Sequence, residues 1–295
     1  MTTAHPAKTS AGASKENLML RTQTEGGGRT SVPVFPVLAA AALLAACAGP
    51  DPEPEPRPTP PPGTAERLDI VDRAIEFHGG ALFEQSRVRL TVASRSGSFD
   101  VDSMADGDRF EQRIRGSNGS NEREYRRDNT ALEVTEGGQP MEMDEAERAR
   151  AESYVNQRMY FLFLPYKLND PGTYKEDQGL EEWNGRPLHR VRVTFEAGTS
   201  DGADSAYVYW FDPETARLEQ FAYDYSKGTG LRFRVLTNYR RISGLLFYDA
   251  VNYGLNTRDG GLTVDDIDPA YVEEELPLVS QIEHRDIDVQ RTGAS

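Results

Sequence analysis

Cys47 is the only cysteine in the chain, and its neighbours decide what chemistry its thiol can do. It directly follows residues 37–46, an unbroken apolar run, and a polar, proline-rich tract follows it. A helix that spans a membrane needs about 20 apolar residues, whereas the hydrophobic region of a signal peptide needs about 7–15. The run therefore predicts a targeting segment, with Arg21 and Arg29 as its positive flank. A buried helix with an incidental core cysteine is the alternative, and the proline tract disfavours it.

The end of this run, Leu44-Ala45-Ala46-Cys47, resembles the lipobox of bacterial lipoproteins. The resemblance implies that the chain is cut before Cys47, that the cysteine sulfur carries a diacylglycerol, and that the new amine is often acylated. Residues 1–46 are then a signal peptide, with Met19 as an alternative start. The membrane becomes an expected partner through this lipid anchor.

Residues 47–63 are expected to be the acylated cysteine and a tether, because proline at nearly every second position blocks helix and sheet. Ala48 stands where enterobacterial lipoproteins retained at the inner membrane carry an aspartate. The expected location in the cell envelope is therefore the outer membrane, at its periplasmic face in preference to the cell surface. Residues 64–291 are expected to form a single domain.

The charge of the chain excludes one class of partner. The formal net charge is −15, and residues 1–46 hold four of the 33 bases and two of the 48 acids, so the remainder carries −17. Such an acidic surface repels nucleic acid, because neutralising phosphates requires lysine and arginine. Protein partners are left open. With its one cysteine assigned to the anchor, the domain has no disulfide and no thiol nucleophile.

The histidines and acids form no recognised catalytic or metal-binding pattern. The histidines after the leader, His78, His189 and His284, are scattered and lack the spacing of a metal site. His78 falls at the end of a predicted helix, where a cationic capping role is expected. The run Asp100, Asp102, Asp106 and Asp108 suggests calcium, but Met104 and Ala105 break the EF-hand pattern. We predict no metal, no cofactor and no catalytic residues.

The hydrophobic pattern predicts which elements position these residues. Apolar residues at spacings of three and four predict helices that begin after Thr64 and Asp144. Between and after them, short alternating segments joined by Gly, Asn and Asp predict about eleven strands of an antiparallel meander. So many strands have to curl, close or split into layers. The expected fold is mainly β with α: a strongly curved antiparallel sheet, or half-barrel, wrapped around two or more helices.

Aromatic residues supply the functional signal. Three successive predicted strands each carry an alternating apolar set, and we expect one broad face that lines a cavity, made by Tyr207, Tyr209, Phe211, Phe221, Tyr223, Tyr225, Leu231, Phe233 and Val235. Core packing is the alternative explanation. The tyrosines favour a cavity, because a buried hydroxyl needs a partner and a wet cavity mouth supplies one.

This plan resembles the LolA/LolB-like lipoprotein-carrier fold, which includes RseB-like and LppX-like proteins. Within it, residues 74–80, 160–168 and 238–246 resemble an uncharacterised group of exported lipoproteins of Bacteroidota and their relatives, over about residues 66–290. The resemblance implies a curved sheet around helices with an apolar cavity for lipid. The expected function is non-catalytic binding or carriage of a lipid or lipoprotein acyl group. The alternatives are an envelope structural or sensor protein with a filled core, or a periplasmic enzyme without a recognised motif.

Overall fold

The computed structural model of the protein describes residues 68–118, 121–196, 206–225, 230–255 and 262–293. These residues belong to the second of two compact units, residues 58–295. The predicted signal peptide, Cys47, the tether and Thr64 lie outside the described residues. In the described ranges, no helix has both the length and the apolar character needed to cross a membrane.

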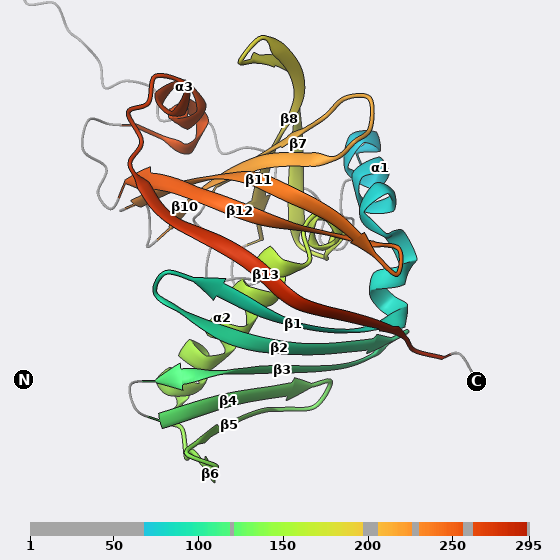
Figure 1. Ribbon diagram of the computed structural model, residues 1–295, viewed down its shortest axis with the longest axis vertical. Helices are drawn as coiled ribbons and strands as arrows, with labels where there is room; N and C mark the ends of the chain where they lie inside the picture. Colours follow the sequence, from blue (N-terminus) through green and yellow to red (C-terminus); the bar gives the residue numbers. More distant parts are fainter. Residues whose placement is uncertain (1–67, 119–120, 197–205, 226–229, 256–261, 294–295) are drawn as a thin grey trace, which may run out of the picture. The chain divides into compact units, whose positions relative to one another are not determined.

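The described strands form one curved antiparallel sheet that does not close on itself (Figure 1). Consecutive strands pair with each other, except that β6 and β7 lie at the two opposite edges of the sheet. The last strand, β13, pairs with both β12 and β1, so the order is β6-β5-β4-β3-β2-β1-β13-β12-β11-β10-β9-β8-β7. The strands are β1 (Ser86–Ser94), β2 (Gly97–Asp106), β3 (Arg109–Asn118), β4 (Asn121–Asp128), β5 (Leu132–Glu136), β6 (Gln139–Pro140), β7 (Thr173–Trp183), β8 (Arg186–Phe195), β9 (Tyr207–Phe211), β10 (Leu218–Tyr225), β11 (Gly230–Ile242), β12 (Leu245–Leu255) and β13 (Leu278–Arg291). The predicted fold class is confirmed, with thirteen strands in the described residues where about eleven were expected.

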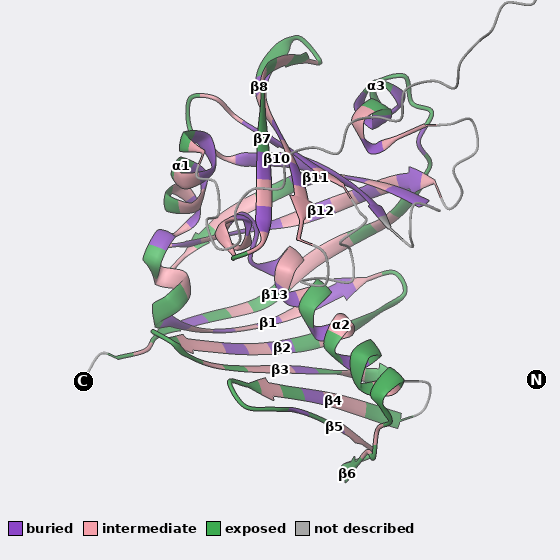
Figure 2. Ribbon diagram, turned by 180° about the vertical axis from the view of Figure 1, so that it is seen from behind, coloured by how far each residue is buried: buried purple, intermediate pink, exposed green. Residues whose placement is uncertain are grey.

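The helix α2 (Glu145–Leu162) lies against the inner face of the sheet (Figure 2). It begins at a capping box in which the Asp144 side chain accepts from the backbone N–H of Glu147 and the Glu147 side chain accepts from the N–H of Asp144. Its buried residues Ala151, Val155, Met159 and Leu162 repeat at spacings of three and four. This stripe packs on the apolar residues of β1–β5.

A second inner cluster covers the half of the sheet from β8 to β12. It joins α1 (Asp69–His78), the residues Leu164 and Leu168 after α2, and the inward side chains of these strands. The helix α1 ends at His78 with Gly79 as its C-cap, and the 3₁₀ helices η1 (Gly80–Gln85) and η2 (Tyr166–Asn169) follow α1 and α2. Together with α2, these segments fill much of the space inside the curved sheet.

The outer face of the same half is covered by a different element. The short helix α3 (Ile267–Val272) and the 3₁₀ helix η3 (Val264–Asp266) pack their apolar residues on Leu188, Trp210 and Phe233. Strands β8 to β12 are therefore apolar on both faces, because each face has its own cover.

Candidate functional site

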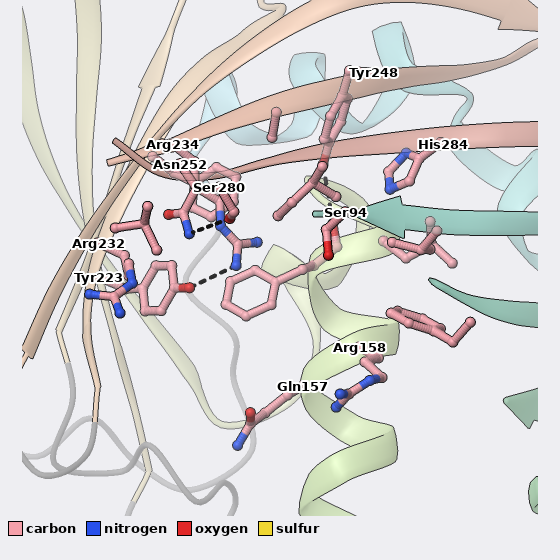
Figure 3. A pocket seen from close by; sticks show the side chains of 18 residues that line it. Ser94, Gln157, Arg158, Tyr223, Arg232, Arg234, Tyr248, Asn252, Ser280 and His284 are labelled. Carbon is pink, nitrogen blue, oxygen red and sulfur yellow. Dashed lines mark hydrogen bonds between the residues drawn. The ribbon is translucent and has the colours of Figure 1, made fainter. Parts of the chain in front are cut away.

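A cleft of about 470 Å³ opens between α2 and the inner face of the sheet (Figure 3). Its lining comes from α2 and from strands β1, β2, β10, β11, β12 and β13. The apolar lining residues are Val92, Phe99, Phe161, Leu162, Phe221, Tyr248, Ala250, Val279 and Ile282. The polar ones are Ser94, Gln157, Arg158, Tyr223, Arg232, Arg234, Asn252, Ser280 and His284. This volume lies within the range of small-molecule sites, which is about 300–1,000 Å³.

The strand register places a row of side chains across the cleft. In the β10–β11 pair Phe221 lies opposite Arg234, in the β11–β12 pair Arg234 lies opposite Asn252, and in the β12–β13 pair Asn252 lies opposite Ser280. Paired residues in a sheet point to the same face, so the four side chains share the inner face. Asn252 donates from Nδ2 to Ser280 Oγ at 3.2 Å, while its Oδ1 is buried without a hydrogen-bond partner in the described residues.

Arg234 is held in this row by aromatic rings. Its guanidinium carbon lies 4.4 Å from the ring centre of Phe161, 5.3 Å from that of Tyr223 and 5.5 Å from that of Phe221. Its Nη2 donates to the Tyr223 hydroxyl at 2.8 Å, and its Nε is buried without a partner (Figure 3). Within the described ranges Arg234 forms no ion pair with a carboxylate.

Two further arginines stand in the lining. On α2, Arg158 lies 3.3 Å from the ring centre of Tyr154 and donates to the Tyr154 carbonyl at 3.1 Å. Burial lowers the pKa of Arg158 from its ordinary value, and it too makes no ion pair with a carboxylate in the part of the chain that the structure describes. Arg232 donates from Nη1 to the carbonyls of Leu231 and Leu255, each at 2.8 Å.

The cleft also contains His284, whose ring is buried. Burial lowers the pKa of His284 to about 4, so its ring is neutral near pH 7. The adjacent carboxylate of Asp249 accepts from the backbone N–H of His284 at 2.9 Å, and the ring Nδ1 is buried with no hydrogen-bond partner among the described residues. A base that activates a nucleophile needs a hydrogen bond to it and a third group that orients the ring. Within the described ranges, no side-chain hydroxyl is hydrogen-bonded to the His284 ring.

Five of the predicted aromatic residues lie on the inner face, and two of the five reach the cleft; they are Tyr207, Tyr209, Phe211, Phe221 and Tyr223. Phe221 and Tyr223 line it, whereas Tyr209 and Phe211 are fully buried in the inner cluster. The hydroxyl of Tyr209 shares a hydrogen bond of 2.6 Å with that of Tyr160 on α2, so its polar atom is satisfied inside the core. Tyr207 stacks on Tyr223 with ring centres 5.5 Å apart.

The predicted residues of β11 do not share a face with those of β9 and β10, so this part of the prediction was wrong. Leu231, Phe233 and Val235 belong to the outer cluster, where the Phe233 ring lies 4.7 Å from that of Tyr271 on α3. The cause is the register, in which Phe233 pairs with Ala222 rather than with Phe221. A displacement by one residue moves a whole set of side chains to the other face. Tyr225 pairs with Gly230 through its backbone, and its side chain lies outside the described residues.

The arginines, Asn252 and Ser280 were not predicted as site residues. A signal for two of them is present in β11, where Arg232 and Arg234 alternate with Leu231 and Phe233. On a strand buried on one side only, this alternation would place the arginines in solvent. Here the arginine side of the strand faces the cleft.

The structure also describes the histidine that was predicted to cap a helix and the acidic strand that suggested calcium. His78 is fully buried and accepts from the Leu218 backbone N–H at 3.2 Å, and burial lowers its pKa to about 3. His78 is therefore neutral, and the prediction that it forms a cationic cap was wrong.

In the acidic strand, Arg87 donates hydrogen bonds to Asp102, and Thr91 donates one to Asp100. No described group of three or more His, Cys, Asp or Glu residues is arranged to hold a metal ion.

Comparison with known proteins adds a family and several solved structures. The model of the family described as "Family of unknown function (DUF6503)" matches residues 125–284. No curated protein matches the chain. Among solved structures, it is similar to a LolA superfamily protein from Nitrosomonas europaea at 11% identity, covering 74% of this chain and 91% of that one, with a TM-score of 0.45.

Two further structures lie at similar or greater distance. A DUF1329 family protein from Desulfovibrio piger is 11% identical, with 77% of this chain and 93% of that one covered and a TM-score of 0.43. The lipoprotein LppX of Mycobacterium tuberculosis is 13% identical, with 54% and 88% covered and a TM-score of 0.28. The chain covers most of each of these three structures, but all three are at most 13% identical to it.

Proposed function

Because the chain belongs to DUF6503, a family of unknown function, we propose its function from the cleft: non-catalytic binding or carriage of a lipid or lipoprotein acyl group. The observation that carries this proposal is the cleft of about 470 Å³ with aromatic and aliphatic walls, including Phe161, Phe221 and Tyr248. Binding sites for small molecules are concave and mostly apolar, with a few polar groups that orient the ligand. The described surroundings of His284 favour binding over catalysis.

The energetics require that most of an acyl chain be enclosed. Burying one methylene contributes about 0.8 kcal/mol, so ten contribute about 8 kcal/mol. Association costs at least about 4 kcal/mol, and the remainder corresponds to millimolar binding. A chain of about fourteen methylenes would leave about 7 kcal/mol, which corresponds to a dissociation constant near 10 µM. Additional contacts with polar lining residues tighten this value.

The location proposed for this activity is the cell envelope. Cys47, acylated after removal of residues 1–46, would anchor the chain in the outer membrane at its periplasmic face, and residues 48–63 would hold the sheet away from the lipid. The support for this is the short apolar run, the lipobox-like end and the proline tract.

The test compares a substitution in the cleft with its neighbour on the same strand. Ser280 lines the cleft, and the next residue, Gln281, is exposed and pairs with Val251 on the outer face. In the full chain carrying Cys47→Ser, Ser280→Trp should fill the cleft and weaken binding of a fluorescent fatty acid at least tenfold. Gln281→Trp should leave it within twofold of the parent.

Three results would count against the proposal. One is a parent chain that rejects the fatty acid at tens of micromolar, which would favour the structural or sensor alternative with a filled interior. Another is equal binding by the Ser280→Trp variant, which would place the ligand elsewhere. The third is an equal loss in both tryptophan variants while the melting temperatures match. Native mass spectrometry of the anchored chain from membranes should also show a co-purifying lipid.

A further inference from the structure

The cleft carries a charge opposite to that of the whole chain. Its described lining includes Arg158, Arg232 and Arg234 and contains no aspartate or glutamate, although the chain has a formal charge of −15. Low-dielectric walls lined by one sign of charge strengthen the local potential. The cleft is therefore a positive region in an acidic protein, which the proposed binding of an apolar chain alone does not require.

Arg234 occupies this region in a way that leaves its charge available. It makes one hydrogen bond in the described residues, to the Tyr223 hydroxyl, and the rings of Phe161, Phe221 and Tyr223 surround its guanidinium. A partly desolvated cation usually has a carboxylate partner, because removing its water is costly. Here the rings hold the side chain in place, and its Nη1 makes no hydrogen bond within the described ranges.

The groups beside Arg234 suit the head of a ligand. Asn252 lies opposite Arg234 in the sheet, and Tyr223 fixes one edge of the guanidinium by a hydrogen bond of 2.8 Å. Next to them, Phe161, Phe221 and Tyr248 form an apolar surface. A polar row that adjoins an aromatic surface matches a molecule with a charged end and an apolar chain.

We propose that the cleft selects a single-chain amphiphile with an anionic head, a fatty carboxylate or the phosphate monoester of a lysophospholipid, whose head binds Arg234. This rests on the proposed acyl-binding function and narrows its ligand class, since an acyl group in ester or amide linkage has no such charge. Arg158 adds positive charge from the α2 wall. Charge-assisted hydrogen bonds from guanidinium to carboxylate or phosphate are about twice as strong as neutral ones.

The experiment measures three ligands that share a palmitoyl chain: palmitate, palmitoyl lysophosphatidate and the uncharged monopalmitoylglycerol. Isothermal titration of the full chain carrying Cys47→Ser should give dissociation constants for the anions at least tenfold below that of the glyceride. Arg234→Gln should weaken the anions about tenfold or more and leave the glyceride within twofold. Comparison of the two anions shows whether a carboxylate or a phosphate is the better head.

Arg241 provides the matched control. It lies 5.3 Å from the ring centre of Phe77, is exposed, and donates to the carbonyls of Phe77 and Gly244 outside the cleft. Arg241→Gln should leave all three affinities unchanged.

The outcomes separate the two proposals. Equal loss of all three ligands in Arg234→Gln would mean that Arg234 only packs against its rings, and the acyl-binding proposal would stand without the anionic head. Failure of every ligand to bind the parent would overturn both proposals. If Arg234→Gln does not fold, the parent's own preference and Arg234→Lys, which keeps the charge, carry the test. A parent that prefers the glyceride or shows no preference would overturn the inference.

Discussion

His78 should make the fold less stable as the pH falls. Its position at the end of a helix suggests the opposite, because a cation is favoured there. The imidazole belongs to the last residue of α1 and is fully buried, and its Nε2 accepts from the Leu218 N–H at 3.2 Å. Burial, followed by the charges of Arg241 and Arg217, lowers its pKa from 6.5 to about 3. The substitution His78→Gln keeps an acceptor for the Leu218 N–H and removes the titration.

The magnitude follows from linkage. Because the pKa of His78 is lower in the folded state, the unfolded chain binds the proton more readily, and stability is lost as the pH falls from 6.5 toward 3. At pH 5 the unfolded chain is about 1.5 units below the pKa of 6.5, and each unit corresponds to about 1.36 kcal/mol. His78 should therefore lower the free energy of unfolding by about 2 kcal/mol at pH 5 relative to pH 7.5. This figure holds for any folded pKa well below 5.

The assay is urea unfolding of the full chain carrying Cys47→Ser, with and without His78→Gln, at pH 7.5 and pH 5. Other groups titrate in this range, among them Asp268, whose pKa burial and then Glu181 raise to about 7. They contribute equally to both chains and cancel in the difference. The parent should lose about 2 kcal/mol more than the variant between the two pH values.

The sign of that difference decides between two physical accounts. A histidine that is protonated at the end of a helix would have a raised pKa, and the parent would gain stability relative to the variant as the pH falls. A gain would therefore refute the buried neutral imidazole. No change would mean that the imidazole reaches solvent in the folded chain.

Three further predictions concern the anchor, metals and one glycine. Cys47→Ser should leave the precursor uncut and free of radiolabelled palmitate, and label in the variant would contradict the lipobox interpretation. Millimolar calcium or a chelator should leave the melting temperature unchanged, whereas a rise of several degrees with calcium would show that the acidic turns bind it. Gly254→Ala should destabilise the fold by more than about 1 kcal/mol in urea titrations, because φ is +150° and an added Cβ would lie 2.1 Å from the Leu231 carbonyl oxygen. Gly97→Ala, at φ +138° with no atom within 4 Å, should cost less, and equal losses would exclude the backbone contact as the cause.

Elements that depend on short-range chemistry were predictable. The cap at Asp144 and the hairpin at Asn184 and Gly185 are local signals, and the structure has α2 starting at Glu145 and positive φ values of 49° and 81° in that turn. The type I′ turn needs positive φ at both central residues, which asparagine and glycine tolerate. The Cys47 anchor lies outside the described residues and stays a prediction.

The cleft depends on the register between strands, which the local pattern did not predict. Both faces of β11 are covered, so the alternation of Leu231, Arg232, Phe233 and Arg234 does not by itself say which set points inward. In the observed register Arg234 lies opposite Phe221. A register displaced by one residue would put Phe233 there and turn the arginines outward. The alternation of residues predicts a wall of aromatic side chains. The observed register instead gives a mixed site, in which the Arg234 cation lies between aromatic rings. The charge of the cleft is thus a consequence of strand pairing, which is why a test of its ligand has to vary the head group as well as the chain.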